Sequence, residues 1–167
     1  MAKHSTGYST VQVALHWTVV VLVTFQFLAH EGMEEAYRAF RRAEMPTGDD
    51  ETFAYLHIGV GVTVLLLMLT RLFLRLTRGV PAPPKDDPLP MRLVADGIHW
   101  LIYALLILLP LSGSVAWFAG VERAADAHVL FQNILLIAIA LHIGGALFQH
   151  FVRRSDVLLR MMRPGRP

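Results

Sequence analysis

The chain has 167 residues, of which 54% are hydrophobic and only 17% charged, and its mean hydropathy is +0.48. This composition is too apolar for an ordinary soluble domain and predicts one membrane domain over residues 1–167. Cysteine is absent, which excludes disulfides, thiolate-held iron–sulfur clusters and covalently attached c-type haem.

A membrane-spanning helix needs roughly 20 consecutive, mostly apolar residues. Four segments meet this requirement, and in chain order they are Val11–Ala29, Phe53–Leu74, Ile98–Phe118 and Val129–Val152. We expect a polar loop over Glu31–Glu51, a proline-rich connector over Pro81–Pro90 that cannot be helical throughout, and a short loop around Ala119–Ala127. The sequence therefore predicts an all-α fold, an integral membrane four-helix bundle.

Basic residues are divided unequally between the two sides of this bundle. Eleven fall on the side that holds both termini, namely Lys3, Arg71, Arg75, Arg78, Lys85, Arg92, Arg153, Arg154, Arg160, Arg163 and Arg166. Four fall on the other side, namely Arg38, Arg41, Arg42 and Arg123. Because cytoplasmic loops carry an excess of Lys and Arg, both termini are expected in the cytoplasm. The net charge of +2 thus reflects topology, and nucleic acid is not an expected partner.

The histidines carry the strongest functional signal, because ionisable side chains inside a membrane are costly and mark functional sites. His128 and His142 lie fourteen residues apart in the fourth span. Fourteen residues of α-helix rise about 21 Å and return to within about 40° of the same face. Two imidazoles would then point the same way at two depths, which is the arrangement that two haems stacked across a membrane require.

The two axial ligands of one haem must lie at nearly the same depth. His16 lies about as far from the cytoplasmic side in the first span as His142 does in the fourth. His57 and His128 both lie close to the opposite side. The sequence therefore predicts a cytoplasmic-side haem between His16 and His142 and a periplasmic-side haem between His57 and His128, about 20 Å apart.

Four other histidines leave alternatives open. His30 is also fourteen residues from His16, so the first span could supply two ligands. His99 could compete with His16, or line a pocket and donate to a haem propionate. His150 is either an interfacial residue or part of a quinone or proton-handling site, and His4 is expected in a solvated tail.

Pairs of glycines follow two of the predicted ligands. Gly59 and Gly61 follow His57, whereas Gly144 and Gly145 follow His142. A backbone without Cβ atoms would leave room for a flat macrocycle, although small residues also simply let helices pack closely.

Several motifs along nearly the whole chain resemble the bacterial cytochrome b561 family, which comprises four-helix dihaem proteins of the inner membrane. They are Leu15-His16-Trp17, Leu56-His57-Ile58-Gly59, Arg71-Leu72-Phe73-Leu74-Arg75-Leu76, Gly97-Ile98-His99-Trp100-Leu101-Ile102-Tyr103, Leu141-His142 and the final Asp156–Met162. The resemblance implies two haems b, with His16, His57, His128 and His142 as the iron ligands. It also implies a multi-pass protein of the bacterial inner membrane that passes electrons between the periplasmic side and ubiquinone.

Similarity to an enterobacterial member suggests a more specific activity, oxidation of superoxide to dioxygen with reduction of ubiquinone. The expected quinone site lies near the cytoplasmic haem, between the start of the first helix, His99 and His150. This chain has a shorter third loop than that member, and Gln149-His150 replaces its His-His pair. The alternative function is an electron-transfer subunit that links quinone to a periplasmic redox enzyme.

Haem iron with two histidine ligands has no open position, so its chemistry is outer-sphere electron transfer. Superoxide could lose its electron at an exposed haem edge, and a cluster of Arg38, Arg41, Arg42 and Arg123 could attract the anion there. Glu31–Glu51 nevertheless holds seven acidic residues against three arginines. The net charge of this loop therefore opposes such attraction, and only a local arginine cluster could provide it.

Overall fold

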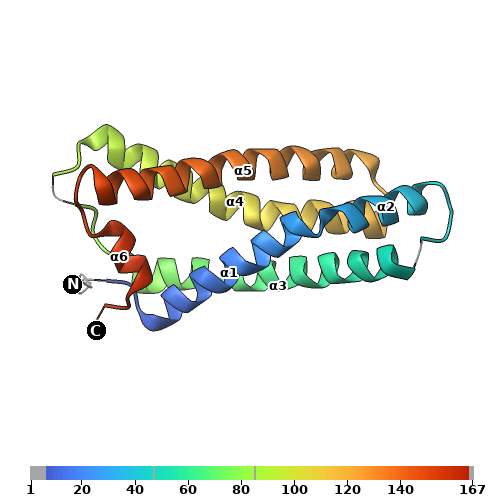
Figure 1. Ribbon diagram of the computed structural model, residues 1–167, viewed down its shortest axis with the longest axis horizontal. Coiled ribbons are helices and arrows are strands. Elements are labelled where there is room, and N and C mark those ends of the chain that lie inside the picture. Colours follow the sequence, from blue (N-terminus) through green and yellow to red (C-terminus); the bar gives the residue numbers. More distant parts are fainter. Residues whose placement is uncertain (1–6, 47, 85, 166–167) are drawn as a thin grey trace.

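A computed structural model describes residues 7–46, 48–84 and 86–165, and all secondary structure in these residues is helical. The helices are α1 (Thr10–Leu28), α2 (His30–Arg41), α3 (Gly48–Arg78), α4 (Leu89–Ala119), α5 (Glu122–Phe151) and α6 (Val157–Met162) (Figure 1). Of these, α1, α3, α4 and α5 are long and apolar enough to cross a membrane. The prediction of an all-helical fold with four such helices is confirmed.

Three of the four long helices begin well before the apolar segments that predicted them. α3 begins five residues before Phe53, α4 nine before Ile98 and α5 seven before Val129. Hydropathy marks only the part of a helix that suits lipid, whereas backbone hydrogen bonding continues into the polar flanks. Three acidic residues in the first turn of α3 also favour its extension, because carboxylates stabilise a helix N-terminus.

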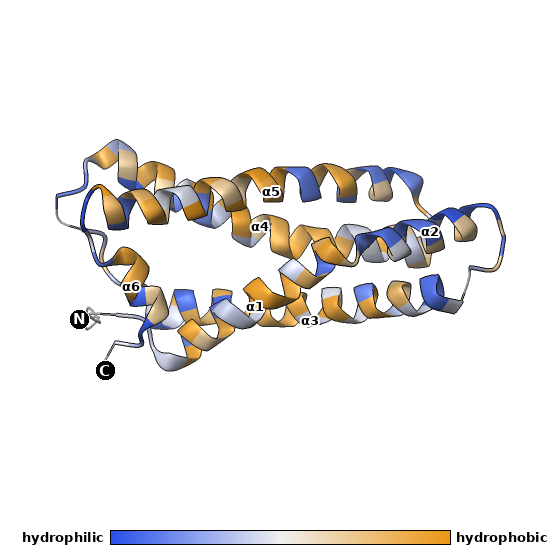
Figure 2. Cartoon of the chain, in the orientation of Figure 1, coloured by the Kyte–Doolittle hydropathy of each residue, from blue (hydrophilic) through white to orange (hydrophobic). Residues whose placement is uncertain are grey.

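The prediction of a loop over Glu31–Glu51 is wrong for its first half, which forms α2. Met33, Ala36, Tyr37 and Phe40 recur at the spacing of one helix face, and the side chain of Ala36 is completely buried. Gly32 allows a close approach, since a Cβ there would lie 2.7 Å from the Cβ of Phe53. α2 is therefore an amphipathic helix packed on α3, and Figure 2 shows its many hydrophilic residues.

The long helices run antiparallel, so each end of the bundle gathers a defined set of segments (Figure 1). We call one end the α6 end; it holds the start of α1, the connector over residues 79–88, the end of α5, and α6. We call the other the α2 end; it holds α2, the start of α3 and the α4–α5 turn. That turn needs only Gly120 and Val121 outside the helices, with Gly120 in the left-handed conformation at φ 64°.

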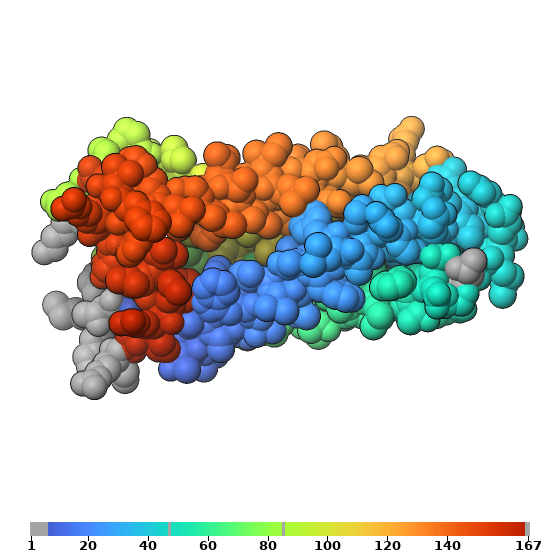
Figure 3. Space-filling model, viewed as in Figure 1, coloured from blue at the N-terminus to red at the C-terminus, as the bar shows by residue number. Residues whose placement is uncertain are grey.

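The protein core is small and lies midway along the bundle. It consists of Val19, Val64, Met68, Leu105, Leu106 and Leu135. Large apolar side chains cover much of the remaining helix surface, for example Val21, Phe73 and Ile137. The space-filling view shows the elongated outline of the bundle (Figure 3). Exposed apolar area of this extent suits contact with lipid.

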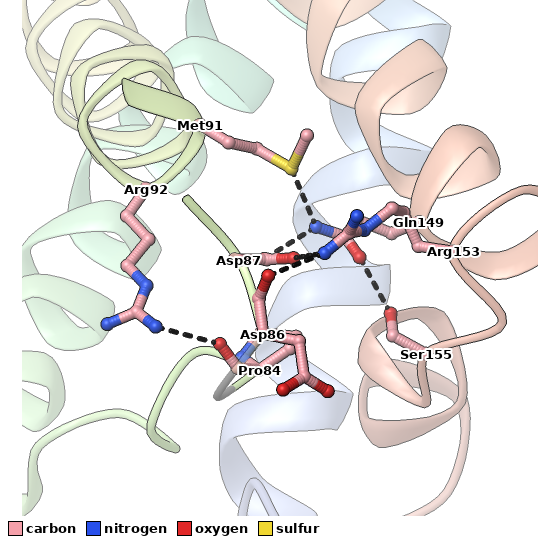
Figure 4. Close-up of polar contacts among 8 residues, drawn as sticks. All are labelled: Pro84, Asp86, Asp87, Met91, Arg92, Gln149, Arg153 and Ser155. Atoms are coloured by element: carbon pink, nitrogen blue, oxygen red, sulfur yellow. Dashed lines mark hydrogen bonds and ion pairs between the residues drawn. The ribbon is translucent and has the colours of Figure 1, made fainter. Parts of the chain in front are cut away.

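A polar network fastens the connector to the end of α5 (Figure 4). Asp87 is 8% exposed and accepts a hydrogen bond of 2.6 Å from Gln149 Nε2. Arg153 lies 3.4 Å from the same carboxylate and donates to the backbone oxygen of Asp86 at 2.7 Å. Ser155 Oγ donates to the side-chain oxygen Oε1 of Gln149 at 2.9 Å. Gln149 is therefore fully engaged in holding this end together.

The C-terminal segment returns to the first helix. Trp17 Nε1 donates to the backbone oxygen of Met161 at 2.9 Å, and the Gly165 N–H donates to the backbone oxygen of Tyr8 at 3.0 Å. The hydrogen bond from the Arg160 guanidinium holds the pKa of the Asp156 carboxyl below its usual value.

Four residues named in the sequence analysis, Lys3, His4, Lys85 and Arg166, lie outside the described residues.

Candidate functional site

The four predicted ligand histidines form two pairs at opposite ends of the bundle. His16 on α1 faces His142 on α5, with ring centroids 6.4 Å apart. His57 on α3 faces His128 on α5, with ring centroids 6.2 Å apart. α5 thus contributes one imidazole to each pair. Whether these residues bind iron stays a prediction.

Each pair joins two helices that are held apart. The closely packed helix pairs include α4 with α5, α3 with α4 and α1 with α3. Within the described residues, neither α1 with α5 nor α3 with α5 is among these pairs. The facing imidazoles therefore lie across spaces between helices, as a flat group inserted into a bundle requires.

The ring spacing suits two ligands of one iron. A bond between a metal and an imidazole nitrogen is about 2.0–2.1 Å, and the ring centre lies roughly 1.2 Å beyond that nitrogen, so rings on opposite faces have centres roughly 6.4 Å apart. Both pairs match this value. The centroids of His99 and His142, in contrast, are 5.0 Å apart in an edge-to-face contact. His16 is the better partner for His142.

The rings of three of these histidines make no hydrogen bond to any residue that the structure describes: His16, His57 and His142. The Nδ1 of His57 is buried without a partner. An unsatisfied polar group inside a membrane costs several kcal/mol. A bond to iron would satisfy one nitrogen of each imidazole, so the residues fit haem b as bis-histidine ligands.

The fourth histidine is oriented by the protein. His128 Nδ1 lies 2.9 Å from the backbone oxygen of Leu109, a contact in which the ring nitrogen must donate. The ring therefore carries its proton on Nδ1 and leaves Nε2 free to bind a metal. Hydrogen bonds of this kind fix the tautomer and direction of metal-binding histidines.

Two residues that position His128 were missed by the sequence analysis. Ser112 Oγ lies 3.3 Å from His128 Nδ1. A Cβ on Gly113 would lie 3.1 Å from both Nδ1 and Cε1 of the same ring. The run Pro110–Ser114, with small residues after a proline inside a helix, could have indicated a place where another group approaches α4.

At the α2 end, the paired histidines line a cavity of about 350 Å³. Its lining includes His57, His128 and Gln26, together with Tyr37 and Arg41 of α2. Aromatic stacking holds α2 in place there, since the Phe40 and Trp117 rings are 5.3 Å apart.

His30, the first residue of α2, lines the same cavity. Its Nδ1 contacts the backbone oxygen of Phe27 at 2.8 Å. The ring that faces His128 is nevertheless that of His57.

At the α6 end, the cavity around His16 and His142 is smaller, about 50 Å³. His99 also lines it, and its Nδ1 contacts the backbone oxygen of Ala95 at 2.6 Å. The His99 ring lies against that of His142 in an edge-to-face contact.

His150 does not line either cavity. Its ring packs edge-to-face on Phe151 at 4.9 Å, and its buried Nδ1 has no hydrogen-bond partner among the described residues. The structure thus places His99 beside the His16–His142 pair but does not bring His150 to the same cavity.

The glycines that follow the ligands are not sites of close helix packing. A Cβ on Gly59, Gly144 or Gly145 would meet nothing within 4 Å, and one on Gly61 would meet only Gln26 Nε2 at 3.5 Å. Close packing therefore does not explain these glycines. Gly61 lines the α2-end cavity, whereas Gly59, Gly144 and Gly145 are exposed and line neither cavity.

The arginines considered for attracting superoxide do not form a free cluster. Arg38 pairs with Glu35 at 2.6 Å, Arg41 with Glu122, and Arg42 with Glu44 at 3.7 Å. Arg123 alone of the four makes no ion pair with a described residue. Exposed pairs of this kind contribute little stability, but each neutralises the field of its arginine.

The chain is similar to known proteins over nearly its whole length. A family model described as prokaryotic cytochrome b561 matches residues 7–164. Cytochrome b562 of Cereibacter sphaeroides is 40% identical over 158 residues, which cover 95% of this chain and 96% of the relative. The probable superoxide oxidase CybB of Yersinia pestis is 31% identical, covering 93% and 95%. Cytochrome b561 homolog 1 of Escherichia coli is 26% identical, covering 93% and 96%.

Proposed function

The chain belongs to the prokaryotic cytochrome b561 family, and on this basis we propose that it passes electrons from a donor at the α2 end to ubiquinone at the α6 end. Membership alone makes it a haem-containing membrane cytochrome of electron transfer. The finer proposal assigns it two haems b, one on His57 and His128 and the other on His16 and His142.

The observation that carries this proposal is the spacing of the two histidine pairs, 6.2 and 6.4 Å between ring centroids. Haem with two histidine ligands supplies reversible one-electron transfer without an open coordination position. The residues hold it by ligation, exclude water with apolar helices, and separate the two centres by about 21 Å along α5.

The α6 end is proposed to face the cytoplasm. The described basic residues at that end are Arg71, Arg75, Arg78, Arg92, Arg153, Arg154, Arg160 and Arg163. Their excess over the arginines at the α2 end follows the positive-inside rule. The donor then reaches the α2 end from the periplasm.

Superoxide is the proposed donor. The relative named as a probable superoxide oxidase supports this choice, as does the cavity beside His57 and His128, which residues of α2 also line. The pairing of Arg38, Arg41 and Arg42 with acidic residues favours the second candidate function, in which a periplasmic redox protein delivers the electrons. A redox protein could dock at the α2 end through contacts between two protein surfaces, so this function does not require unpaired arginines to attract a small anion.

Ubiquinone is proposed to bind near the His16–His142 pair, with His150 as a hydrogen-bond donor to a carbonyl oxygen. His99 Nδ1 already donates to the backbone oxygen of Ala95, so its Nε2 would accept a hydrogen bond from a hydroxyl group of the reduced quinone. His150 lies outside the cavity that His99 lines, but its buried Nδ1, which has no hydrogen-bond partner among the described residues, supports its inclusion. His99→Phe and His150→Phe should slow ubiquinone reduction while both haems stay bound. If quinone turnover in both variants equals that of the parent, the site lies elsewhere.

The test begins with haem content. Acidified acetone should extract all haem, and the pyridine haemochrome should show close to two per polypeptide; a ratio near one contradicts the dihaem proposal. Purified protein is then exposed without oxygen to superoxide or to ubiquinol, while the Soret and α bands are followed. Fast reduction by superoxide supports the oxidase, whereas reduction by ubiquinol alone supports the electron-transfer subunit.

A further inference from the structure

The charged residues that line the two cavities have opposite net charge. At the α2 end they are Glu34, Arg41, Glu122 and Asp126, three acidic residues against one basic. At the α6 end the charged lining residues are Arg71 and Arg75, with no acidic residue among the described ones. The two sites therefore differ in electrostatic environment although both are built from a pair of histidines.

The two cations at the α6 end are not neutralised by ion pairs with described residues. Arg71 Nη1 lies 3.5 Å from the backbone oxygen of Gln12. The Arg75 guanidinium lies 5.1 Å from the Trp100 ring centroid and 5.7 Å from that of Tyr103. Cation–π contacts leave the charge in place, so both arginines keep their field.

Other charged groups near this cavity do not cancel that field. Asp96 is exposed and precedes His99 by three residues on α4 but does not line the cavity. Arg160 lies close to Tyr8 but is paired with Asp156 at 2.7 Å, so the two together add no net charge there. Burial raises the pKa of the Tyr8 phenol, and Arg75 and Arg71 partly offset this increase, as a positive potential in the cavity requires.

At the α2 end, the single basic side chain that lines the cavity is already in an ion pair. Arg41 pairs with Glu122, which leaves the carboxylates of Glu34 and Asp126 without an ion pair among the described residues. Haem b would bring the same two propionates to either site, so only the protein charges distinguish them.

We propose that Arg71 and Arg75 raise the reduction potential at the His16–His142 site above that at the His57–His128 site, and so direct electrons from the α2 end to the α6 end. This inference rests on the two haems of the proposed function. Each electron lost at the α2-end site is gained at the α6-end site, where the positive charges favour the reduced form. A nearby unit charge in a medium of intermediate dielectric changes such an equilibrium by about tenfold or more.

The test is potentiometric titration of the purified dihaem protein, followed by the haem α band. The parent should show two midpoints, and His16→Ala should remove the upper one. Arg71→Gln and Arg75→Gln should each lower the upper midpoint by about 59 mV, a tenfold loss for one electron, without moving the lower one. Asp126→Asn, which removes a negative charge at the other end, should raise only the lower midpoint.

Matched variants separate charge from shape. Arg78→Gln removes a cation from the same helix outside the cavity lining and should leave both midpoints unchanged. Arg71→Lys and Arg75→Lys keep the positive charge and should leave the upper midpoint unchanged. If the Gln variants lose haem, these Lys variants still test whether the charge sets the midpoint. Three results would overturn this inference while leaving the proposed function intact. They are unshifted midpoints in the Gln variants, a lowered upper midpoint in the Lys variants, and loss of the lower midpoint in His16→Ala. A haem ratio below two in the parent overturns the proposed function with it.

Discussion

His128 is bonded through Nδ1 to the backbone oxygen of Leu109 on the neighbouring helix, at 2.9 Å. This contact links α5 to α4 and leaves Nε2 of the ring, which faces the His57 ring with centroids 6.2 Å apart, without a proton. The imidazole is held on one side before any cofactor arrives. Preorganisation of this kind lowers the cost of binding, because the ring need not be ordered when the metal binds.

Loss of either histidine of a pair should have the same effect. We expect His57→Ala and His128→Ala to remove or convert one haem to five-coordinate, high-spin iron, and His16→Ala and His142→Ala to do so with the other. Optical and electron paramagnetic resonance spectra of the four variants check this. If His30→Ala reproduces the spectrum of His128→Ala, the assignment of His57 is wrong; the same result for His99→Ala and His142→Ala would exclude His16.

Gly113 should be sensitive to a single methyl group. In Gly113→Ala the new Cβ would lie 3.1 Å from the His128 ring, so the ring must move and its bond to Leu109 must weaken. We expect a shifted or partly high-spin spectrum for the α2-end haem only. Gly97→Ala on the same helix is the control, because a Cβ there meets nothing within 4 Å and alanine favours a helix by about 1 kcal/mol.

Asp87 should be important for stability. Asp87→Ala leaves Gln149 and Arg153 without their shared acceptor, and an unsatisfied buried polar group costs about 1–3 kcal/mol. A lowered thermal midpoint in detergent is the expected result. Asp86→Ala should have little effect, because Arg153 contacts only the backbone oxygen of Asp86. Equal midpoints for the two variants would contradict the role given to Asp87.

Acid should release the C-terminal segment. The pKa of Asp156 is lowered by its hydrogen bond from Arg160, so this contact stabilises α6 above the ordinary carboxyl pKa of about 3.9 and is lost as the pH falls through the lower, folded-state value. The protection of α6 amides against hydrogen exchange, relative to the intrinsic exchange rate at each pH, should therefore fall below about pH 4. In Asp156→Asn this fall should be absent. The effect is small, because the pair is partly exposed to solvent.

The sequence predicts the long helices and the histidine pairs for the same reason: both depend on distance along a helix. Residues 14 apart must share a face, and equal depth must bring His16 near His142 and His57 near His128. Whether these side chains bind iron stays a prediction.

What the sequence did not predict depends on contacts between segments. The sequence predicts a loop in place of α2 because the many charged residues conceal the helical spacing of Met33, Ala36 and Tyr37. The support that Ser112 and Gly113 give to His128 arises only where α4 crosses α5. The absence of His150 from both cavities likewise reflects which face of α5 it occupies, a detail that depth alone does not fix.

One uninterrupted helix, α5, carries an imidazole of both pairs. Deleting a single residue between His128 and His142 would turn one of them by about 100° and draw it about 1.5 Å closer to the other. Only one of the two histidine pairs could then form, because the turned imidazole would no longer face its partner. The segment of α5 between His128 and His142 therefore cannot gain or lose single residues. Insertions there are tolerable only in sets that complete whole turns, such as seven residues for roughly two turns, and each such set would lengthen the electron's path by about 10 Å.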